Sequence, residues 1–190
     1  MQDRQFVERV LAPDTAYVFH ATGYYGNNYS FTLREIAAMP VREGWYLEPP
    51  RLAHYVIKQS APSTYLYADA RKRFESYVVD TQIDWNTGEF TLPSVIQKLR
   101  TCIRPGQTVY CATPLLAGIA QTLFPMSKAL DIHDVDCLNL GQYVVENWHC
   151  PYATHKDNRS LTCVMPKLSQ MYQWFYLEPE TDSDESGIEM

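Results

Sequence analysis

The pattern of apolar and polar positions changes character about a third of the way along the chain. Between Tyr17 and Leu47, β-forming residues alternate with turn residues at Gly23–Asn28 and at Gly44. This pattern predicts three strands in a meander, the third of them over Trp45–Leu47. The stretch that follows, Arg51–Gln59, fits either a short helix or an extended arm.

Apolar residues then return at helical spacing and are separated by short buried runs that read as strands. A Thr-Pro pair and a Leu-Pro pair mark two of the helix starts. The predicted helices cover Tyr65–Tyr77, a segment from Pro93 with Val95, Ile96 and Leu99 inside, Leu115–Phe124, Leu138–Glu146 and Leu161–Leu177, and the predicted strands cover Thr108–Ala112 and Ala129–Ile132. Three strands followed by alternating strands and helices predict a mixed α/β sheet flanked by helices.

The two ends of the chain differ from its body. Met1–Leu11 has apolar positions among charges and predicts a short amphipathic helix or arm. The last segment, 178–190, holds six acidic residues and no basic one, which favours a disordered tail. The expected organisation is therefore an arm over 1–13, one domain over 14–177 and an acidic tail over 178–190.

Composition narrows the class of protein. The chain has 190 residues and a net charge of −6, so it lacks the overall positive charge of a general nucleic-acid binder. No run approaches eighteen apolar residues and no signal-peptide core follows the N-terminus. We expect an intracellular protein, cytoplasmic or nuclear, that has no membrane partner and keeps its five cysteines as thiols or metal ligands.

The predicted order of elements is that of RNase H-like folds, which include the DEDD exonucleases. Short spaced pieces of the sequence also resemble a group of nuclease-like proteins found in arthropod genomes and in mobile or viral elements. These pieces are Gly23-Tyr24, Phe31 with Arg34-Glu35-Ile36-Ala37, Glu48-Pro49-Pro50, Ile83-Asp84-Trp85 with Gly88, Val109–Ala112, Asp131 with Cys137, and Cys150 with His155 and Cys163. The resemblance covers residues 16–176 and implies an RNase H-like mixed sheet.

The resemblance also implies where a nuclease would hold its metal ions. Exonucleases of this kind place Asp-x-Glu at the end of the first strand, because two Mg²⁺ ions need carboxylate oxygens on both sides of the scissile phosphate. In this chain those positions fall on His20 and Thr22, and the acid expected after the Thr108–Ala112 strand falls on Thr113. Imidazole and hydroxyl groups are poor Mg²⁺ ligands. We therefore expect a degenerate site with no catalytic residues.

If this sequence is aligned with the nuclease pattern a few residues differently, the acidic site is displaced rather than lost. The acids that could then bind Mg²⁺ or Mn²⁺ are Asp14, Glu35, Asp131 and Asp134. Asp131 lies near the end of a predicted strand and Asp134 follows that strand closely, where acids also serve as turn and cap residues.

A zinc site is the second candidate chemistry. Cys137, Cys150, His155 and Cys163 follow a Cys-x12-Cys-x4-His-x7-Cys spacing, and structural Zn²⁺ sites use four tetrahedral nitrogen and sulfur ligands. Such a site would hold the polar loop before the last helix. The alternative is that Cys137 and Cys163 are small core residues and that His155 lies on a surface loop.

Two groups of residues suggest binding surfaces. Tyr24, Tyr25 and Tyr29 crowd one turn, where tyrosines can stack on bases, contact a protein or fill the edge of the core. The adjacent bases Arg71, Lys72 and Arg73 fit a binding patch or an ordinary solvated helix face. The acidic chain favours a protein partner, with nucleic acid held without cleavage as the other possibility.

Three functions are compatible with these patterns. The first is a catalytically degenerate nuclease-like domain that acts as a binding or regulatory module. The second is an active metal-dependent 3′–5′ exonuclease with the displaced acidic site. The third, which rests on the resemblance alone, is a structural or regulatory component of a viral or mobile-element system.

Overall fold

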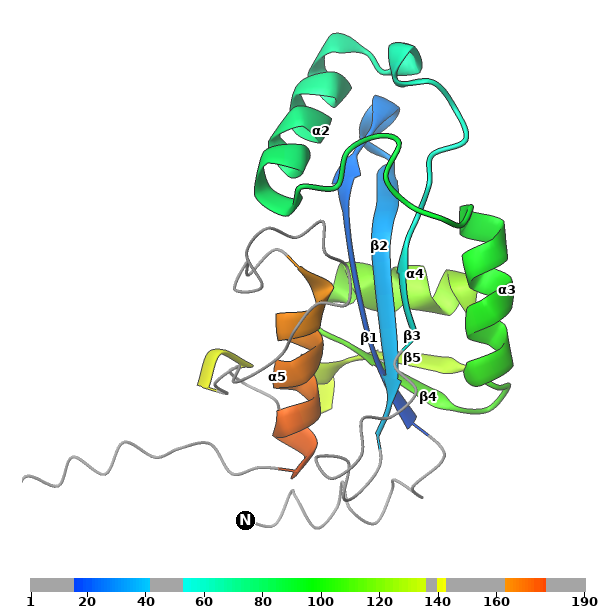
Figure 1. Cartoon of the computed structure of the whole chain (residues 1–190). Coiled ribbons are helices and arrows are strands. Elements are labelled where there is room, and N and C mark those ends of the chain that lie inside the picture. Colours follow the sequence, from blue (N-terminus) through cyan, green and yellow to red (C-terminus); the bar gives the residue numbers. More distant parts are fainter. Residues whose placement is uncertain (1–15, 42–52, 136–139, 143–162, 177–190) are drawn as a thin grey trace, which may run out of the picture.

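The computed structural model describes residues 16–41, 53–135, 140–142 and 163–176, which form a five-stranded sheet flanked by helices (Figure 1). The strands are β1 (Ala16–Tyr25), β2 (Phe31–Pro40), β3 (Ala53–Val56), β4 (Thr108–Cys111) and β5 (Lys128–Asp131). The first two are ten residues long and form a hairpin that extends past the other strands.

The order of strands across the sheet is β3-β2-β1-β4-β5. The first three strands pair antiparallel, while β4 and β5 run parallel to β1. An antiparallel meander joined to parallel strands through its first member is the RNase H-like topology, so the predicted mixed α/β fold is confirmed. The carboxyl end of β4 lies beside the middle of β1, because Cys111 at that end pairs with Phe19.

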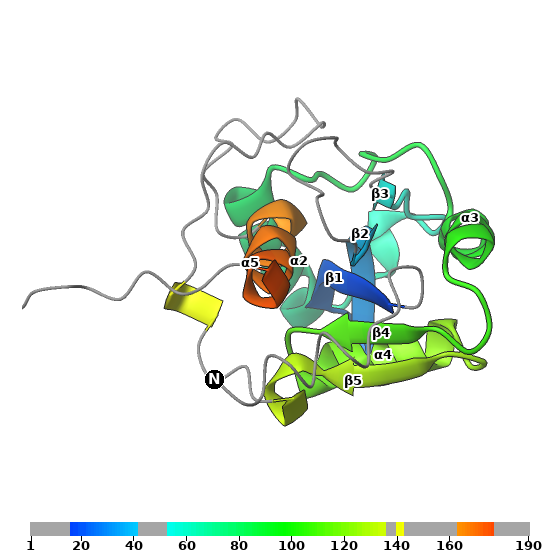
Figure 2. The same ribbon diagram turned by 90° about the horizontal axis from the view of Figure 1, so that it is seen from below.

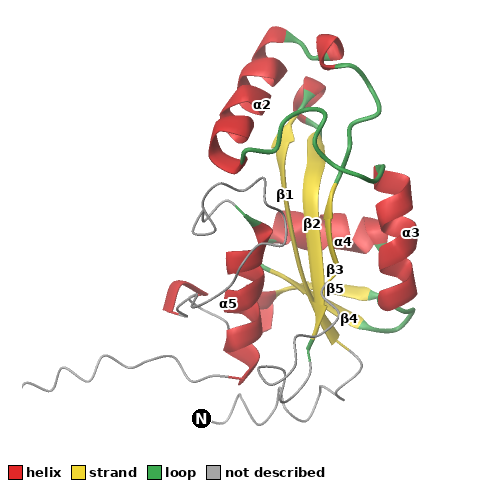
Figure 3. Cartoon of the chain, viewed as in Figure 1, coloured by secondary structure: helices red, strands yellow, loops and turns green. Residues whose placement is uncertain are grey.

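The helices lie in two layers on the faces of this sheet (Figures 2 and 3). Viewed from below, α5 and α2 lie on one side of the β1–β2 hairpin and α3 lies on the other. The bounds of the helices are α2 (Ala68–Thr81), α3 (Leu92–Cys102), α4 (Pro114–Leu123) and α5 (Val164–Tyr176), with short 3-10 turns at Asn27–Tyr29, Ser63–Tyr65, Ile132–Val135 and Leu140–Gln142.

The face covered by α3 and α4 is apolar throughout its centre. Phe19 and Ile36 project from the hairpin into this layer and are fully buried. Val95 and Leu99 of α3 and Leu116 of α4 close over them. Burial of large side chains here, at roughly 25 cal/mol per Å² of apolar surface, provides a main source of stability.

The opposite face is apolar only at one end. Near the start of β1, Val18 and Met39 pack against Leu168 and Met171 of α5. Further along the same face, the inward side chains become polar, beginning with His20. This is the region between α5 and α2, and it holds the candidate site.

The third strand differs from the sequence-based expectation. It covers Ala53–Val56, inside the stretch predicted as a short helix or extended arm, whereas Trp45–Leu47 lies outside the described residues. Ala53 and Val56 point toward opposite sides of the sheet. A strand of four residues is too short for this alternation to be recognised in the sequence. Of the helix expected over Leu138–Glu146, the structure describes only the 3-10 turn at Leu140–Gln142.

A β-bulge at Thr22–Gly23 changes the course of the β1–β2 hairpin. Thr22 pairs with Glu35 but Gly23 pairs with Leu33, so Arg34 is an extra residue on β2. A bulge lets two successive side chains reach the same layer, and both Arg34 and Glu35 are fully buried. Gly23 is needed here because a Cβ atom at this position would lie 2.0 Å from the carbonyl oxygen of Thr32.

Candidate functional site

The carboxyl group of Glu35 is the centre of a buried polar cluster between α2 and α5. Glu35 comes from β2 and is fully buried, and the side chain of His54, from β3, is 3% exposed. Their hydrogen bond joins His54 Nε2 to Glu35 Oε1 at 2.7 Å. Because a carboxylate can only accept, an ionised Glu35 places a proton on Nε2 of His54. The pair therefore holds an acid and a base in fixed contact.

The second oxygen of Glu35 is the end of a chain of hydroxyl groups. Thr22 Oγ1 donates to Glu35 Oε2 at 3.3 Å and lies 3.0 Å from the hydroxyl of Tyr77, on α2. Because the Thr22 hydroxyl already donates its hydrogen bond to Glu35, the Tyr77 hydroxyl is the donor to Thr22. Burial raises the pKa of Tyr77, so this hydroxyl keeps its proton at ordinary pH.

A cysteine thiol completes the contacts of Glu35 from the third side. Cys163 precedes α5 and its Sγ lies 3.8 Å from Glu35 Oε1, to which the thiol donates. The same sulfur accepts from the backbone N–H of Met165 at 3.5 Å, in the manner of a helix cap. Cys163 thus joins the start of α5 to the sheet, and both oxygens of Glu35 are engaged by side chains of three other elements.

His20 lies beside this cluster on β1 and is kept neutral. It pairs across the sheet with Ala37, which pairs in turn with His54. Burial and, to a smaller extent, the positive charge of Lys167 on α5 lower the pKa of His20 to about 4, while Glu35 opposes both effects. The Nδ1 atom of His20 is buried and has no hydrogen-bond partner among the described residues.

The other member of the bulge, Arg34, binds a loop rather than the cluster. Its Nη2 donates to the carbonyl oxygens of Asp84 and Thr87 at 2.7 and 3.2 Å. The guanidinium lies 5.8 Å from the centre of the Phe74 ring. Burial lowers the pKa of Arg34, although arginine remains charged at physiological pH. Arg34 therefore fixes the connection between α2 and α3 above Glu35.

The acids proposed for a displaced nuclease site do not come together in the described part of the chain. Asp131 pairs with Cys111, which lies in the layer under α4, whereas Glu35 faces α2 and α5 on the other side of the sheet. Asp131 Oδ1 accepts from the backbone N–H of His133, which is a turn contact. Asp134 is exposed in the next turn, and Asp14 lies outside the described residues.

Thr113 and His20 stand at two of the positions where the resemblance predicted that a nuclease would have acids. Thr113 follows β4, where the family resemblance predicts a carboxylate, and its Oγ1 accepts from the backbone N–H of Leu116 at 3.3 Å to cap α4. Its role is therefore that of an N-cap. His20 and Thr22 lie on β1 as predicted and point into the cluster around Glu35.

The zinc prediction lies mostly outside the described residues. Cys137, Cys150 and His155 are not described, and Cys163 is buried with its thiol on Glu35. Across the described ranges, no three His, Cys, Asp or Glu side chains are arranged to hold a metal ion. The Cys₃His site stays a prediction.

The tyrosine-rich turn divides between core and surface. Tyr24 is buried against Phe74 and Tyr77, with its ring centre 5.1 Å from that of Phe74. Tyr25 and Tyr29 are exposed. The basic residues of α2 join them, because the guanidinium of Arg73 lies 4.6 Å from the ring centre of Tyr29. The two binding groups predicted separately thus form one region.

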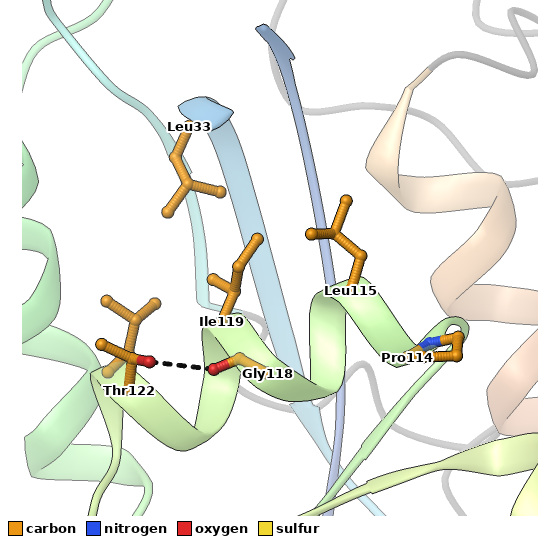
Figure 4. Close-up of a pocket in the computed structure, with 7 residues that line it drawn as sticks. Leu33, Pro114, Leu115, Gly118, Ile119 and Thr122 are labelled. Carbon is orange, nitrogen blue, oxygen red and sulfur yellow. Dashed lines mark hydrogen bonds between the residues drawn. The ribbon is translucent and has the colours of Figure 1, made fainter. Parts of the chain in front are cut away.

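A cavity lies on the apolar face, away from this chemistry (Figure 4). It measures about 430 Å³, and the side chains of Leu33, Leu115 and Ile119 line it. Its remaining lining residues are Pro114, Gly118, Thr122 and Leu123, and the Thr122 hydroxyl is bonded to the carbonyl oxygen of Gly118. No titratable side chain enters it, so it offers apolar contact and no acid–base chemistry.

Sequence reasoning missed several members of both regions. His54 and Tyr77 were not linked to Glu35, because their pairing depends on the register of β3 and on the packing of α2. Asn27 joins Tyr65 and Tyr67 to the tyrosine turn, because its side chain is hydrogen-bonded to the backbone carbonyl of Tyr65 and the backbone N–H of Tyr67. The one signal in sequence was the run of tyrosines before Arg71.

No family model, no curated protein and no solved structure matches the chain. The structure alone therefore supports the comparison with RNase H-like folds, and it does so at the level of topology. None of the helices in the described part of the chain is long and apolar enough to cross a membrane.

Proposed function

We propose that this chain is a binding or regulatory module built on an RNase H-like sheet whose nuclease position has been converted into an internal polar cluster. The observation that carries the proposal is the state of Glu35. Its two carboxylate oxygens accept from His54, Thr22 and Cys163, three donors of the protein itself. These donors occupy three of the roughly four lone-pair sites of the carboxylate, so a metal ion would compete with the protein's own groups for it.

The neighbouring positions support the same conclusion. A two-metal mechanism needs several carboxylates over one scissile phosphate. Beside the carboxyl end of β4 the chain instead has neutral His20 and Thr22 on β1 and the capping residue Thr113 after β4. Asp131, an acid at the end of β5, faces the opposite layer.

The buried cluster has a clear structural use in such a module. Hydrogen-bonded polar groups in a low-dielectric interior favour a single arrangement of the elements that contribute them. Here the contributors are β1, β2, β3, α2 and the start of α5. A domain whose role is to present a surface benefits from this rigidity, and the acidic chain directs the choice of partner toward protein. The wider kinship with arthropod, mobile-element or viral proteins is an expectation of the sequence resemblance alone.

A nuclease assay tests the proposal directly. The purified full chain is incubated with labelled single- and double-stranded DNA and RNA in the presence of Mg²⁺ or Mn²⁺. We expect no metal-dependent loss of substrate, and no difference between the wild type and Glu35→Gln, which keeps the size of the side chain.

One outcome of this assay would contradict the proposal. Degradation that needs the metal and is abolished by Glu35→Gln or Asp131→Asn, but not by the exposed Asp134→Asn, would establish the exonuclease with a displaced site. If every variant keeps the nuclease activity, the activity points to a contaminating nuclease. The protein is then purified again by a second method, and an unchanged specific activity would also overturn the proposal.

A further inference from the structure

The tip of the β1–β2 hairpin, the residues before α2 and the first residues of α2 form an exposed aromatic and basic surface. We call it the hairpin-tip patch and define it as Tyr25, Tyr29, Tyr65, Tyr67, Arg71 and Lys72. Its four tyrosines are 41%, 73%, 69% and 67% exposed, in chain order. They are four of the seven large hydrophobic residues that the described part of the chain leaves exposed. Single exposed tyrosines are ordinary, but a cluster marks an interaction site.

Two buried or half-buried side chains hold this patch in place. Asn27 donates from Nδ2 to the carbonyl oxygen of Tyr65 at 2.8 Å, and its Oδ1 accepts from the backbone N–H of Tyr67 at 2.8 Å. Arg73 donates to the carbonyl oxygens of Tyr25 and Gly26 at 2.7 and 3.0 Å. These contacts link segments about 40 residues apart, and they fix the backbones that carry the tyrosines before any partner arrives.

The backbone at the tip is also strained. Asn28 and Tyr29 both have positive φ, 56° and 55°. The left-handed region is costly for a bulky residue such as tyrosine, at roughly 1 kcal/mol or more, and such strain concentrates at functional sites. Here it holds the Tyr29 ring in solvent under the guanidinium of Arg73. The tip therefore keeps an exposed ring in a defined position at a conformational cost.

The charges of the patch are unlike those of the whole chain. Residues 61–73 contain three basic side chains and one acid, Asp69, in a chain whose net charge is −6. Arg71 and Lys72 are exposed, and neither forms an ion pair with another described residue. Exposed cations beside tyrosine rings are complementary to a peptide segment whose carboxylates are separated by apolar side chains or exposed backbone.

We infer that the hairpin-tip patch docks an acidic, extended segment of a partner protein, an inference that rests on the binding function proposed above. Carboxylates of the segment pair with Arg71 and Lys72. The tyrosine rings cover the chain between those carboxylates, and their hydroxyls bond to its backbone. Tyrosine and arginine are the residue types that most often dominate binding energy in protein interfaces.

The number of cations favours a peptide over a nucleic acid. Binding to a strand depends on the number of phosphates neutralised, because counterion release scales with that number. Arg73 is committed to the tip, which leaves only Arg71 and Lys72 for phosphates. Two phosphate contacts provide little of the affinity that a nucleic-acid strand gains from counterion release.

The test is a fluorescence anisotropy titration of the full chain into a labelled acidic peptide of about 12 residues, three repeats of Glu-Leu-Asp-Pro. A peptide with Lys in place of the acids and an oligothymidylate of similar length serve as the other arms. We expect saturable binding of the acidic peptide alone. The double variant Arg71→Glu/Lys72→Glu should weaken it at least about tenfold, equivalent to about 1.4 kcal/mol. Tyr65→Ser/Tyr67→Ser should weaken it by a similar factor.

Matched controls separate the patch from general charge and apolarity. Lys98→Glu/Lys128→Glu changes the net charge equally at exposed positions on α3 and β5, and Met126→Ser removes an exposed apolar side chain elsewhere. Neither should change the affinity more than about twofold, and circular dichroism should show every variant folded. Asn27→Ala, which alters the support but no patch side chain, should weaken binding by a smaller factor.

Three results would overturn the inference. They are no binding of the acidic peptide, equal losses in the patch variants and their controls, or tighter binding of oligothymidylate that the patch variants abolish. None of these produces metal-dependent cleavage, so failure here leaves the proposed non-nuclease function standing. Cleavage in the earlier assay would remove that function whether or not the peptide binds.

Discussion

The two faces of the sheet are built from alternate residues of the same strands, yet they differ in kind. Phe19 and Ile36 point to the α3–α4 side and pack into a large apolar cluster. Their sequence neighbours His20 and Glu35 point to the α2–α5 side and enter a polar cluster. Stability alone does not require this polarity, because a well-packed apolar replacement is often at least as stable as a buried ion pair. The difference teaches that one face is built for apolar packing, whereas the other holds a hydrogen-bonded polar cluster at buried positions.

The largest effect should come from the apolar face. Phe19→Ala removes a fully buried ring that packs edge-on against Phe124, with ring centres 6.0 Å apart. We expect a loss of about 3–5 kcal/mol in the free energy of unfolding, from the lost transfer energy and the cavity left behind. Urea denaturation measures it, with Phe19→Leu as the milder control. A loss below about 1 kcal/mol would mean that this face is not the main core.

The cluster on the polar face should be nearly as sensitive to a single deletion. Glu35→Ala leaves His54 and Thr22 without their shared acceptor, and we expect a loss of about 3 kcal/mol in urea denaturation. The double variant Glu35→Leu/His54→Leu removes both partners and should recover much of that loss. If the double variant is as unstable as Glu35→Ala or more so, the polar face contributes stability that an apolar face could not, and the contrast drawn above fails.

The dependence of stability on pH should also differ between the faces. The pKa of His20 is lowered to about 4 in the folded chain, from 6.5 in the unfolded one. Above pH 6.5 the imidazole is neutral in both states, so its full stability is present. Between pH 6.5 and 4 the unfolded state binds the proton more tightly and stability falls, by up to about 3 kcal/mol.

Urea midpoints measured between pH 7 and pH 4 test this dependence. His20→Gln should flatten the fall, whereas His133→Gln, at an exposed turn, should leave it unchanged. An identical pH profile in the wild type and His20→Gln would show that His20 is solvated in the folded chain.

The smallest effect should come from the hydroxyl relay. Thr22→Val preserves shape but removes the hydrogen bonds to Glu35 and to the Tyr77 hydroxyl. We expect a loss of about 1 kcal/mol, measured by urea denaturation, because Tyr77 and Glu35 each lose one partner. Thr22→Ser, which keeps the hydroxyl, should cost less than Thr22→Val. The reverse order would mean that the methyl group of Thr22, rather than its hydroxyl, matters to the cluster.

Much of the fold could be predicted from the sequence, because strong apolar periodicity marks the long elements. The hairpin, β4, β5 and the helices α3 and α4 follow from alternation, from helical spacing and from Pro at the helix starts. The strand beside β2 covers Ala53–Val56, in a stretch that the sequence left open between a short helix and an extended arm, since it is four residues long and carries a histidine near its centre. Such a strand is defined by its pairing with β2 rather than by its own composition.

The candidate site was less accessible to sequence reasoning. His20 and Thr22 were placed correctly on the first strand through the predicted order of elements. Glu35 appeared only as a possible substitute acid. Its contacts depend on the bulge at Thr22–Gly23, which no periodicity reveals and which reverses the expected alternation of β2. The hairpin-tip patch required distant segments to meet at Asn27, a contact between single polar atoms.

The position of β1 at the centre of the sheet also constrains how the chain can be made. During synthesis β1 can pair with β2 almost at once, but its other neighbour, β4, lies about 90 residues further on. Until β4 emerges, one edge of β1 is unpaired and the apolar residues that α4 will cover are open to other chains. Contacts this distant in sequence form slowly. A nascent chain that stops before Thr108 should therefore be the species most exposed to aggregation and to chaperone binding.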